Sequence, residues 1–358
     1  ARPPPFETVI PALLCSVIFV TPMLQDSSPS ILDSVDYSGF AEHEVTEIRD
    51  AINRCIQGEY ESAVPVLERY AEEGEIASVF VLGKLYAGGK GVPKSPERAA
   101  RLLRSNVAKS HAPSMITLGE LLESSSPDES LQLYRQAAAG NDPLGFYKLG
   151  EVYELGRLGE RSNGELAFDY FEKLAALGDG EGESRLARYH DEGRGVPADV
   201  VKATRLYRKA ALGGHLPSMV TLSRRYFAGQ GLDADPVAAV GWLTRASQLG
   251  STEAQVLLGL RYEMGDATFQ DLNEAGQLYS RAAAAGNPEG KFHLGRLYRD
   301  GIGTEADPVR AYVLFAEAQG YPRAQEALTE LETKLSAEQR RAAMRKLEDA
   351  GSEKKPAN

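Results

Sequence analysis

The sequence predicts an all-α protein built as a right-handed α-solenoid of stacked helix-turn-helix repeats. Two observations predict it. A glycine-rich turn between two helical patterns recurs with a spacing of about 36 residues, and the apolar residues in each copy follow the helical period rather than the strand period. One copy is too small to bury its apolar face alone, so we expect the copies to stack into an elongated array.

Each copy begins at a small residue that precedes its first helix. These residues are Gly74, Ser110, Gly140, Gly178, Gly214, Gly250, Gly286 and Gly320. Within the first helix, a Leu-Gly pair is followed by a tyrosine three residues after the glycine, as in "LGRLY" from Leu294. We expect the leucine to fill the seam between paired helices, the glycine to let them approach closely, and the tyrosine to lie on the same face.

A Gly-x-Gly turn then ends the first helix, because glycine accepts the positive φ of a helix C-terminus. Pro93, Pro197, Pro236 and Pro308 are predicted to start second helices, and Asp235 or Asp307 to cap them. A phosphate-binding loop would need a preceding strand and usually a lysine followed by serine or threonine. Because no strand pattern precedes these turns, we interpret the glycines as joints between helices.

The stretches "LGRLYRDGIGTEADPVRAYVLFAEA" and "YHDEGRGVPADVVKATRLYRKAALGG" resemble Sel-1-like repeats of the bacterial type, which are relatives of the tetratricopeptide repeat. The resemblance covers residues 74–319 as about seven copies. It implies an α-solenoid that serves as a scaffold or adaptor, although such repeats serve many partners. Cysteine-rich bacterial relatives join their repeats with disulfides, and this chain lacks those cysteines.

The segments outside the repeats are assigned from their composition. Residues 1–25 contain the apolar run "VIPALLCSVIFV", Val9 to Val20, which is too short to span a bilayer and is typical of an export signal or a membrane anchor. The alternative is a segment packed against the array. Residues 26–40, rich in Ser, Asp and Pro, are predicted to be a linker.

Residues 41–73 are predicted to form a tetratricopeptide-like helix pair. Residues 320–350 are predicted to be C-terminal capping helices, with Ser336 as N-cap and Gln339 completing a capping box. Residues 351–358 are predicted to be a disordered tail.

Composition excludes several function classes. The net charge of −11 disfavours nucleic-acid binding, which requires a basic face. The only cysteines, Cys15 and Cys55, have no metal-like spacing, although a bridge between them is an open alternative. We expect no metal site, no cofactor and no catalytic residues, because no catalytic motif is present. His111 and His215 occupy one slot in two repeats and are interpreted as turn or cap residues.

Placing the tetratricopeptide pattern on each repeat predicts which side chains face the concave side. We expect an apolar floor, acidic walls in the first half and basic walls in the second, which would suit an extended peptide or a partner helix. The alternative is that the floor residues pack between repeats and the charges form a solvated face. The predicted partner-binding residues are Phe80, Lys84, Glu120, Tyr147, Glu151, Glu154, Arg188, Arg224, Phe227, Phe292, Arg296 and Arg299.

Three hypotheses about function follow. The first is an exported, periplasmic or membrane-associated scaffold that holds a partner protein or peptide, with membrane association through residues 9–24. The second is a regulatory adaptor in the cytosol or a lumen. The third is a polysaccharide-binding scaffold, in which Phe80, Tyr147 and Phe292 would serve as platforms for sugar rings.

Overall fold

The structure is a computed structural model that describes residues 39–353. These residues form α-helices and contain no β-strand, as the sequence predicts. They divide into two units: unit 1 extends to Arg185 and includes Arg194–Val196, and unit 2 comprises Leu186–Gly193 and the chain from Pro197 onward. Helix α10 (Gly180–Glu192) therefore contributes to both units.

Unit 1 contains α2 (Glu42–Gln57), α3 (Tyr60–Glu72), α4 (Ile76–Gly88), α5 (Pro96–Val107), α6 (Ala112–Leu122), α7 (Pro127–Ala139), α8 (Pro143–Leu155) and α9 (Gly164–Ala176). Unit 2 contains α11 (Val200–Leu212), α12 (Leu216–Ala228), α13 (Pro236–Gln248), α14 (Thr252–Met264), α15 (Leu272–Ala284), α16 (Pro288–Asp300), α17 (Pro308–Glu317), α18 (Pro322–Lys334) and α19 (Ala337–Glu353).

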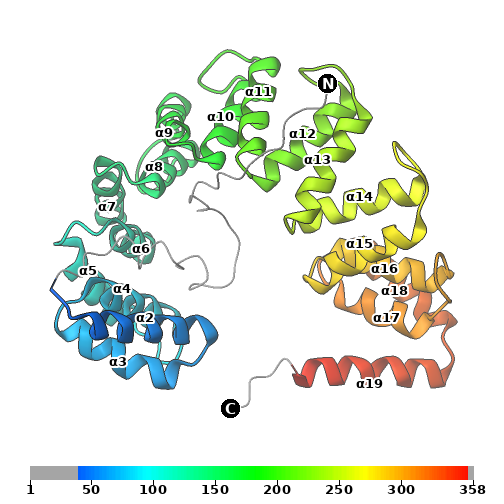
Figure 1. Cartoon of the computed structure of the whole chain (residues 1–358), viewed down its shortest axis with the longest axis horizontal. Helices are drawn as coiled ribbons and strands as arrows, with labels where there is room; N and C mark the ends of the chain where they lie inside the picture. Colours follow the sequence, from blue (N-terminus) through cyan, green and yellow to red (C-terminus); the bar gives the residue numbers. More distant parts are fainter. Residues whose placement is uncertain (1–38, 354–358) are drawn as a thin grey trace. The chain divides into compact units, whose positions relative to one another are not determined.

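Consecutive helices pack as hairpins within each unit. In unit 1, α4 packs on α5, α6 on α7 and α8 on α9; in unit 2, α12 packs on α13, α14 on α15 and α16 on α17. The first helices of successive hairpins also contact one another, as α4 contacts α6 and α14 contacts α16. In unit 1, α4, α6 and α8 follow one another along one side of the stack, with α5, α7 and α9 on the other (Figure 1). We call the exposed surface of the first helices the first-helix face of each unit.

The Leu-Gly pair forms the seam inside each hairpin. A Cβ added at Gly119 would lie 2.5 Å from the ring of Tyr134, and one at Gly259 would lie 2.6 Å from the ring of Tyr279. Both distances are too short for any side chain to fit without movement of the ring. The prediction that this glycine permits close approach of the second helix is therefore confirmed.

The second helices begin as the sequence predicts in some repeats and later in others. The Asp235 carboxylate accepts a hydrogen bond from the backbone N–H of Ala238 at 2.9 Å, and Asp307 caps α17 in the same way. The prediction is wrong for Pro93 and Pro197, which lie in loops three residues before α5 and α11 begin. Proline suits an extended loop as well as a first helical turn, so the capping side chain, rather than proline, marks the start of the helix.

The second glycine of the turn has a role beyond ending the helix. Gly231 has a φ of +69°, and a Cβ there would lie 2.5 Å from the carbonyl oxygen of Val200, at the start of α11. A Cβ at Gly91 would lie 2.1 Å from the Cβ of Tyr60, at the start of α3. The turn of one repeat thus packs against the second helix of the preceding repeat. A side chain at either glycine would prevent this contact.

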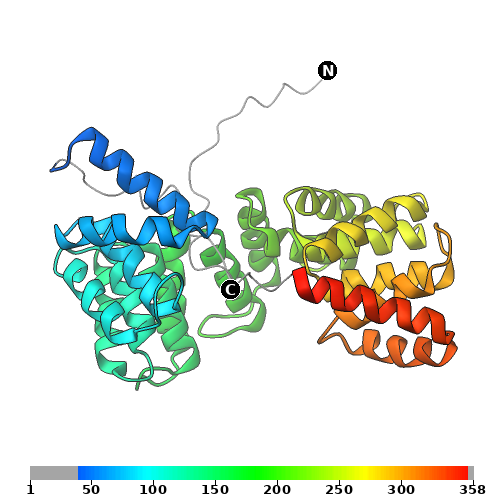
Figure 2. The same cartoon turned by 90° about the horizontal axis from the view of Figure 1, so that it is seen from below.

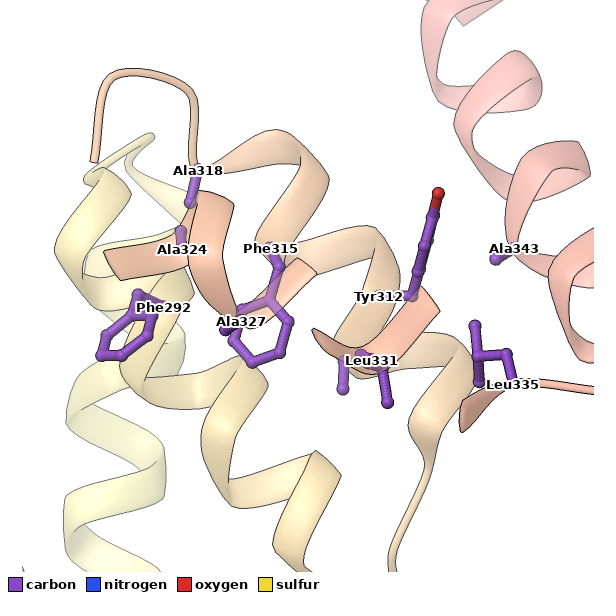
Figure 3. Close-up of a cluster of buried hydrophobic side chains, with 10 residues drawn as sticks. Phe292, Tyr312, Phe315, Ala318, Ala324, Ala327, Leu331, Leu335 and Ala343 are labelled. Carbon is purple, nitrogen blue, oxygen red and sulfur yellow. The ribbon is translucent and has the colours of Figure 1, made fainter. Parts of the chain in front are cut away.

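The C-terminal helices cover the end of unit 2. Phe315 of α17, Leu331 of α18 and Leu335 belong to one buried cluster, which Ala343 of α19 completes (Figure 3). Figure 2 shows α19, in red, beside the orange helices of this end. The capping box is confirmed, because Gln339 N–H donates to Ser336 Oγ at 3.2 Å while Ser336 N–H donates to Gln339 Oε1 at 2.9 Å.

The ends of the chain are described only in part. The predicted export signal or anchor at residues 1–25 lies outside the described residues, as does most of the predicted linker. Helix α19 continues to Glu353, into the segment predicted as a tail. Cys55 is a buried free thiol whose pKa is raised by burial to about 11, whereas Cys15 lies outside the described residues.

Candidate partner-binding surface

The aromatic residues predicted to form an exposed floor are buried. Phe80, Tyr147 and Phe292 expose 3%, 9% and 6% of their surface. Phe80 packs edge-on against His111, with 5.4 Å between ring centroids, and Phe292 packs on Phe315 at 5.9 Å (Figure 3). Contrary to the expectation, these positions face the neighbouring helices, because successive hairpins approach closely. The three rings belong to the core and offer no platform for a sugar.

The predicted acidic residues lie in unit 1 and are engaged in ion pairs between repeats. Glu120 of α6 lies 2.6 Å from the ammonium of Lys148 on α8, and 47% of its side chain is exposed. Glu154, at the end of α8, has only 3% of its side chain exposed. In the first pair the carboxylate is exposed while Lys148 exposes only 18% of its side chain, and Glu154 is part of a buried cluster.

Arg185 forms the centre of that buried cluster. Its Nη1 donates to Glu154 at 3.0 Å, its Nε donates to Glu181 at 2.6 Å, and its Nη2 donates to the Tyr147 hydroxyl at 2.8 Å. Arg194 donates a further hydrogen bond to Glu154 at 3.2 Å. Glu151 accepts a hydrogen bond from the Tyr147 hydroxyl at 3.0 Å. The cluster therefore ties α8 to the beginning of α10 and to the following loop.

The pKa of Arg185 follows from competing effects. Burial by itself lowers the pKa of Arg185. The hydrogen bond to Glu181 and the negative charges of Glu181 and Glu154 raise this pKa by more than burial lowers it, so the net shift is upward. The guanidinium stays charged at every physiological pH. The arrangement suits a permanent structural ion cluster rather than a group that exchanges protons with a substrate.

The predicted basic residues lie in unit 2, and they also have carboxylate partners. Arg224 of α12 lies 2.5 Å from Glu253 of α14, with 58% of its side chain exposed. Arg296 of α16 pairs with Glu263 of α14, and Arg299 lies 2.7 Å from Asp300. The basic wall is therefore neutralised by neighbouring acidic residues within the unit.

The remaining predicted residues are partly buried. Lys84 lies 5.4 Å from the ring centroid of Phe80, and Arg261 lies 4.2 Å above the ring of Phe227. Arg188 is half-buried in unit 2. Among the twelve predicted partner-binding residues, the exposed ones are Glu120 in unit 1 and Arg224 in unit 2.

The sequence pattern missed Arg225, which is 4% exposed. Arg225 pairs with Asp191 and donates to Thr204 Oγ1 at 2.7 Å. It follows Arg224 directly, so charge alone does not distinguish the buried arginine from the exposed one. The available signal was its position: the corresponding residue in another repeat is the buried Leu85, so an arginine there must enter the hairpin interior.

Two further kinds of feature are absent from the described helices. Within residues 39–353, no three His, Cys, Asp or Glu side chains are grouped so as to hold a metal ion. None of the helices in that range combines the length and apolarity required to cross a bilayer. Residues 9–24, the predicted site of membrane association, lie outside this range.

Comparison with known proteins identifies the repeat. A family model described as "Sel1 repeat" matches seven segments: residues 76–105, 118–142, 147–179, 180–215, 217–251, 252–287 and 288–318. The chain is similar to an uncharacterized protein of Neisseria meningitidis serogroup B, with 31% identity over 158 residues. This match covers 44% of the chain but only 34% of the length of that relative.

Solved structures show the same architecture. The chain is 26% identical to a Sel1 repeat protein from Oxalobacter formigenes, with a TM-score of 0.60 over 84% of this chain and 92% of the other. A protective antigen of uropathogenic Escherichia coli with an SLR fold is 23% identical, with a TM-score of 0.54 over 91% and 72% of the two chains. The seven matched segments span more than half of the sequence, so the chain belongs to the Sel1 repeat family.

Proposed function

We propose that the protein is a non-catalytic scaffold that binds a partner protein or peptide on its first-helix face, and that it acts in the bacterial cell envelope. Sel1 repeat proteins are typically protein-interaction scaffolds, and their fold is generally non-catalytic. The finer proposal concerns which surface binds and which residues contribute.

The exposed ion pairs of the first-helix face carry this proposal. Glu120 with Lys148, and Arg224 with Glu253, join first helices of successive repeats in unit 1 and unit 2. An exposed pair such as Arg224–Glu253 contributes about 0–1 kcal/mol, so an anionic group of a partner can replace Glu253 at little cost. At the other pair, Lys148 exposes only 18% of its side chain, so a cationic group of a partner would join Lys148 at Glu120 rather than replace it. The backbones beneath these pairs are held by the buried seams, so the charges are presented on a preorganised surface.

The buried ion pairs do not serve this role. Removing Glu154 would leave Arg185 with fewer compensating charges in the interior, which costs more than an exposed pair provides. We therefore assign partner contact to the exposed pairs and structural cohesion to the buried ones. A group that pairs with Glu120 is cationic, and one that pairs with Arg224 is anionic.

The envelope location rests on the apolar run from Val9 to Val20. Fractionation of the native host tests it. We expect the protein in the envelope or periplasmic fraction, together with known envelope markers. Recovery with cytosolic markers would instead support the adaptor hypothesis.

Site-specific photo-crosslinking tests the binding surface. A photoreactive amino acid replaces Glu120 or Arg224 in the full chain, and Gln136 of α7 or Gln277 of α15 in matched controls on exposed positions of second helices. We expect one partner protein to be captured from the native host at Glu120, at Arg224 or at both, and not at the controls. Equal capture at all four positions would contradict a role for the first-helix face.

A further inference from the structure

The turn between α14 and α15 of unit 2, yellow in Figure 1, carries a protruding aromatic residue. Phe269 lies three residues before α15 begins, and 95% of it is exposed. A phenylalanine ring in this position leaves a large apolar surface in water that a partner can bury. In the Gly-x-Gly turns of other repeats, the corresponding residues are ones that suit an exposed loop: Pro93, Pro197, Asp233 and Glu305.

The turn holds Phe269 in a fixed place. On one side of it, the Thr268 hydroxyl donates to the carbonyl oxygen of Arg261 at 3.2 Å. On the other side, the Gln270 side-chain amide donates to the carbonyl oxygen of Glu263 at 2.9 Å. Both acceptors belong to α14, so the residues that flank Phe269 are tied to that helix. A ring presented in this way loses little conformational freedom when it binds.

The second helix of the same hairpin borders a surface cavity of about 370 Å³. The cavity lies between α15, α16 and the turn that joins α16 to α17. Gly276 of α15 leaves it open, because corresponding positions of other second helices in unit 2 carry side chains: Thr204, Val240 and Tyr312. We call it the Gly276 cavity, and its apolar lining residues are Leu272, Leu294, Leu297, Tyr298 and Ile302.

Phe269 and the Gly276 cavity lie close together on one surface. Leu272 lines the cavity and is the first residue of α15, three residues after Phe269 in the chain. The Cα atoms of these two residues are therefore at most about 11 Å apart. Phe269 nevertheless stays outside the cavity of its own chain, as its exposure shows, because Thr268 and Gln270 hold the turn on α14.

We propose that unit 2 forms a symmetric dimer in which Phe269 of each copy enters the Gly276 cavity of the other. An apolar cavity of about 150 Å³ holds a benzene ring, so the Gly276 cavity is large enough for a phenyl ring. Because each copy carries the ring and the cavity side by side, two copies related by a two-fold axis make both contacts at once.

A second copy fits this surface better than a different protein does. A different protein would have to supply both an apolar side chain for the cavity and a cavity for Phe269, whereas a second copy has both. The contact lies at the turn end of the hairpin and on its second helix. The inference therefore does not depend on partner binding by the first-helix face.

Sedimentation equilibrium of the full chain tests the proposal. Phe269→Ala removes the ring, and Gly276→Val fills the cavity with the side chain that α13 carries at the corresponding position, Val240. An added Cβ at Gly276 lies 3.6 Å from the nearest atom of Leu297, an ordinary contact, so this variant is expected to fold. The matched control is Leu249→Ala, because Leu249 is 54% exposed and follows the end of α13, opposite the turns.

We expect the wild type to dimerise, and Phe269→Ala and Gly276→Val each to weaken the dimer on the order of 100-fold, because each variant loses both contacts. Leu249→Ala should stay close to wild type. A mixture of Phe269→Ala with Gly276→Val restores one contact, so the two variants should bind each other about tenfold more tightly than either binds itself. Any association through residues 1–25 is common to all these proteins and cancels in the comparison.

Photo-crosslinking gives a second measurement. Gln277 of α15 lines the cavity, so a photoreactive amino acid there should capture a second copy of the chain rather than the partner protein.

Several outcomes would overturn the proposal. They are a monomeric wild type, a dimer that either substitution leaves intact, an equal loss with Leu249→Ala, and a mixture no tighter than its components. Assembly into open chains of copies instead of dimers would contradict the reciprocal contact.

Discussion

Arg185 of unit 1 and His293 of unit 2 occupy the same position of the repeat, two residues before the small seam residues Ala187 and Gly295. Arg185 is charged and is surrounded by Glu154, Glu181 and Glu151. His293 is 4% exposed, with its ring stacked on Tyr279 at 5.0 Å. One position thus holds a buried ion cluster in unit 1 and, in unit 2, a ring stacked on an aromatic neighbour with the Glu289 carboxylate 3.9 Å from its Nε2.

The preceding repeat explains the difference. In unit 1, Glu154 at the end of α8 is available to Arg185 and Arg194. In unit 2 the corresponding Glu263 pairs with Arg296 and accepts a hydrogen bond from the Tyr279 hydroxyl at 2.9 Å. Glu263 is therefore already engaged, and His293 is left among aromatic rings. A position in the repeat predicts burial, whereas its charge depends on the residues that the neighbouring repeat provides.

The largest expected effect is in the buried cluster of unit 1. Glu154→Gln leaves Arg185 with fewer compensating charges in the interior, and we expect it to lower the free energy of unfolding by about 3 kcal/mol. Urea denaturation of the full chain measures this loss, and hydrogen exchange of α8 localises it. The matched control Glu263→Gln, whose ion pair is more exposed, is expected to cost about 1 kcal/mol. Equal losses would contradict the distinction between the two units.

Acid is expected to weaken unit 2 through His293. Burial, followed by the charges of Arg296 and Arg323, lowers the pKa of His293 from 6.5 to about 4. Because the unfolded chain then binds a proton that the folded chain does not, stability is complete above pH 6.5 and decreases as the pH falls from there towards 4. We expect a loss of about 2 kcal/mol at pH 5.

Hydrogen exchange of α16 between pH 7 and pH 5 measures this loss, after correction for the intrinsic rate of exchange. His293→Phe retains an aromatic ring and removes the titration, so its α16 should lose less protection over the same range. A variant that responds to acid as strongly as the wild type would show that another group is responsible.

Replacement of a seam glycine by alanine is expected to lower the free energy of unfolding by the same amount in the two units. A Cβ at Gly150 would lie 2.5 Å from the ring of Phe171, and one at Gly259 would lie 2.6 Å from that of Tyr279. We expect Gly150→Ala and Gly259→Ala each to lower the free energy of unfolding by about 2 kcal/mol, because the ring must move. Thermal denaturation measures both. Gly241→Ala is the control, since no atom lies within 4 Å of its added Cβ, and a gain in stability is expected there.

The smallest effect on stability is expected at Arg224. Its ion pair with Glu253 is exposed, so Arg224→Ala should change the free energy of unfolding by less than about 1 kcal/mol. The same substitution should weaken retention of the partner in a pull-down from the native host. A large loss of stability would instead place Arg224 among the structural ion pairs, with Arg225.

Local features of the repeat were predictable from the sequence. The aspartate caps at Asp235 and Asp307, the seam glycines and the capping box at Ser336 depend on residues within a few turns of one another. The pairing of charges was not predictable. Glu154 and Arg185 are 31 residues apart, and Arg225 is distinguished from Arg224 only by the side of the helix that it faces.

The sequence by itself determined that the chain forms paired helices in a repeating array, because periodicity, capping and glycine turns act through short-range sterics and hydrogen bonds. Only the tertiary structure decided that Phe80, Tyr147 and Phe292 are core residues, and that most of the predicted wall charges hold repeats together. The physical reason is that burial and ion pairing depend on which side chain the next repeat places within a few ångströms, and no single repeat contains that information.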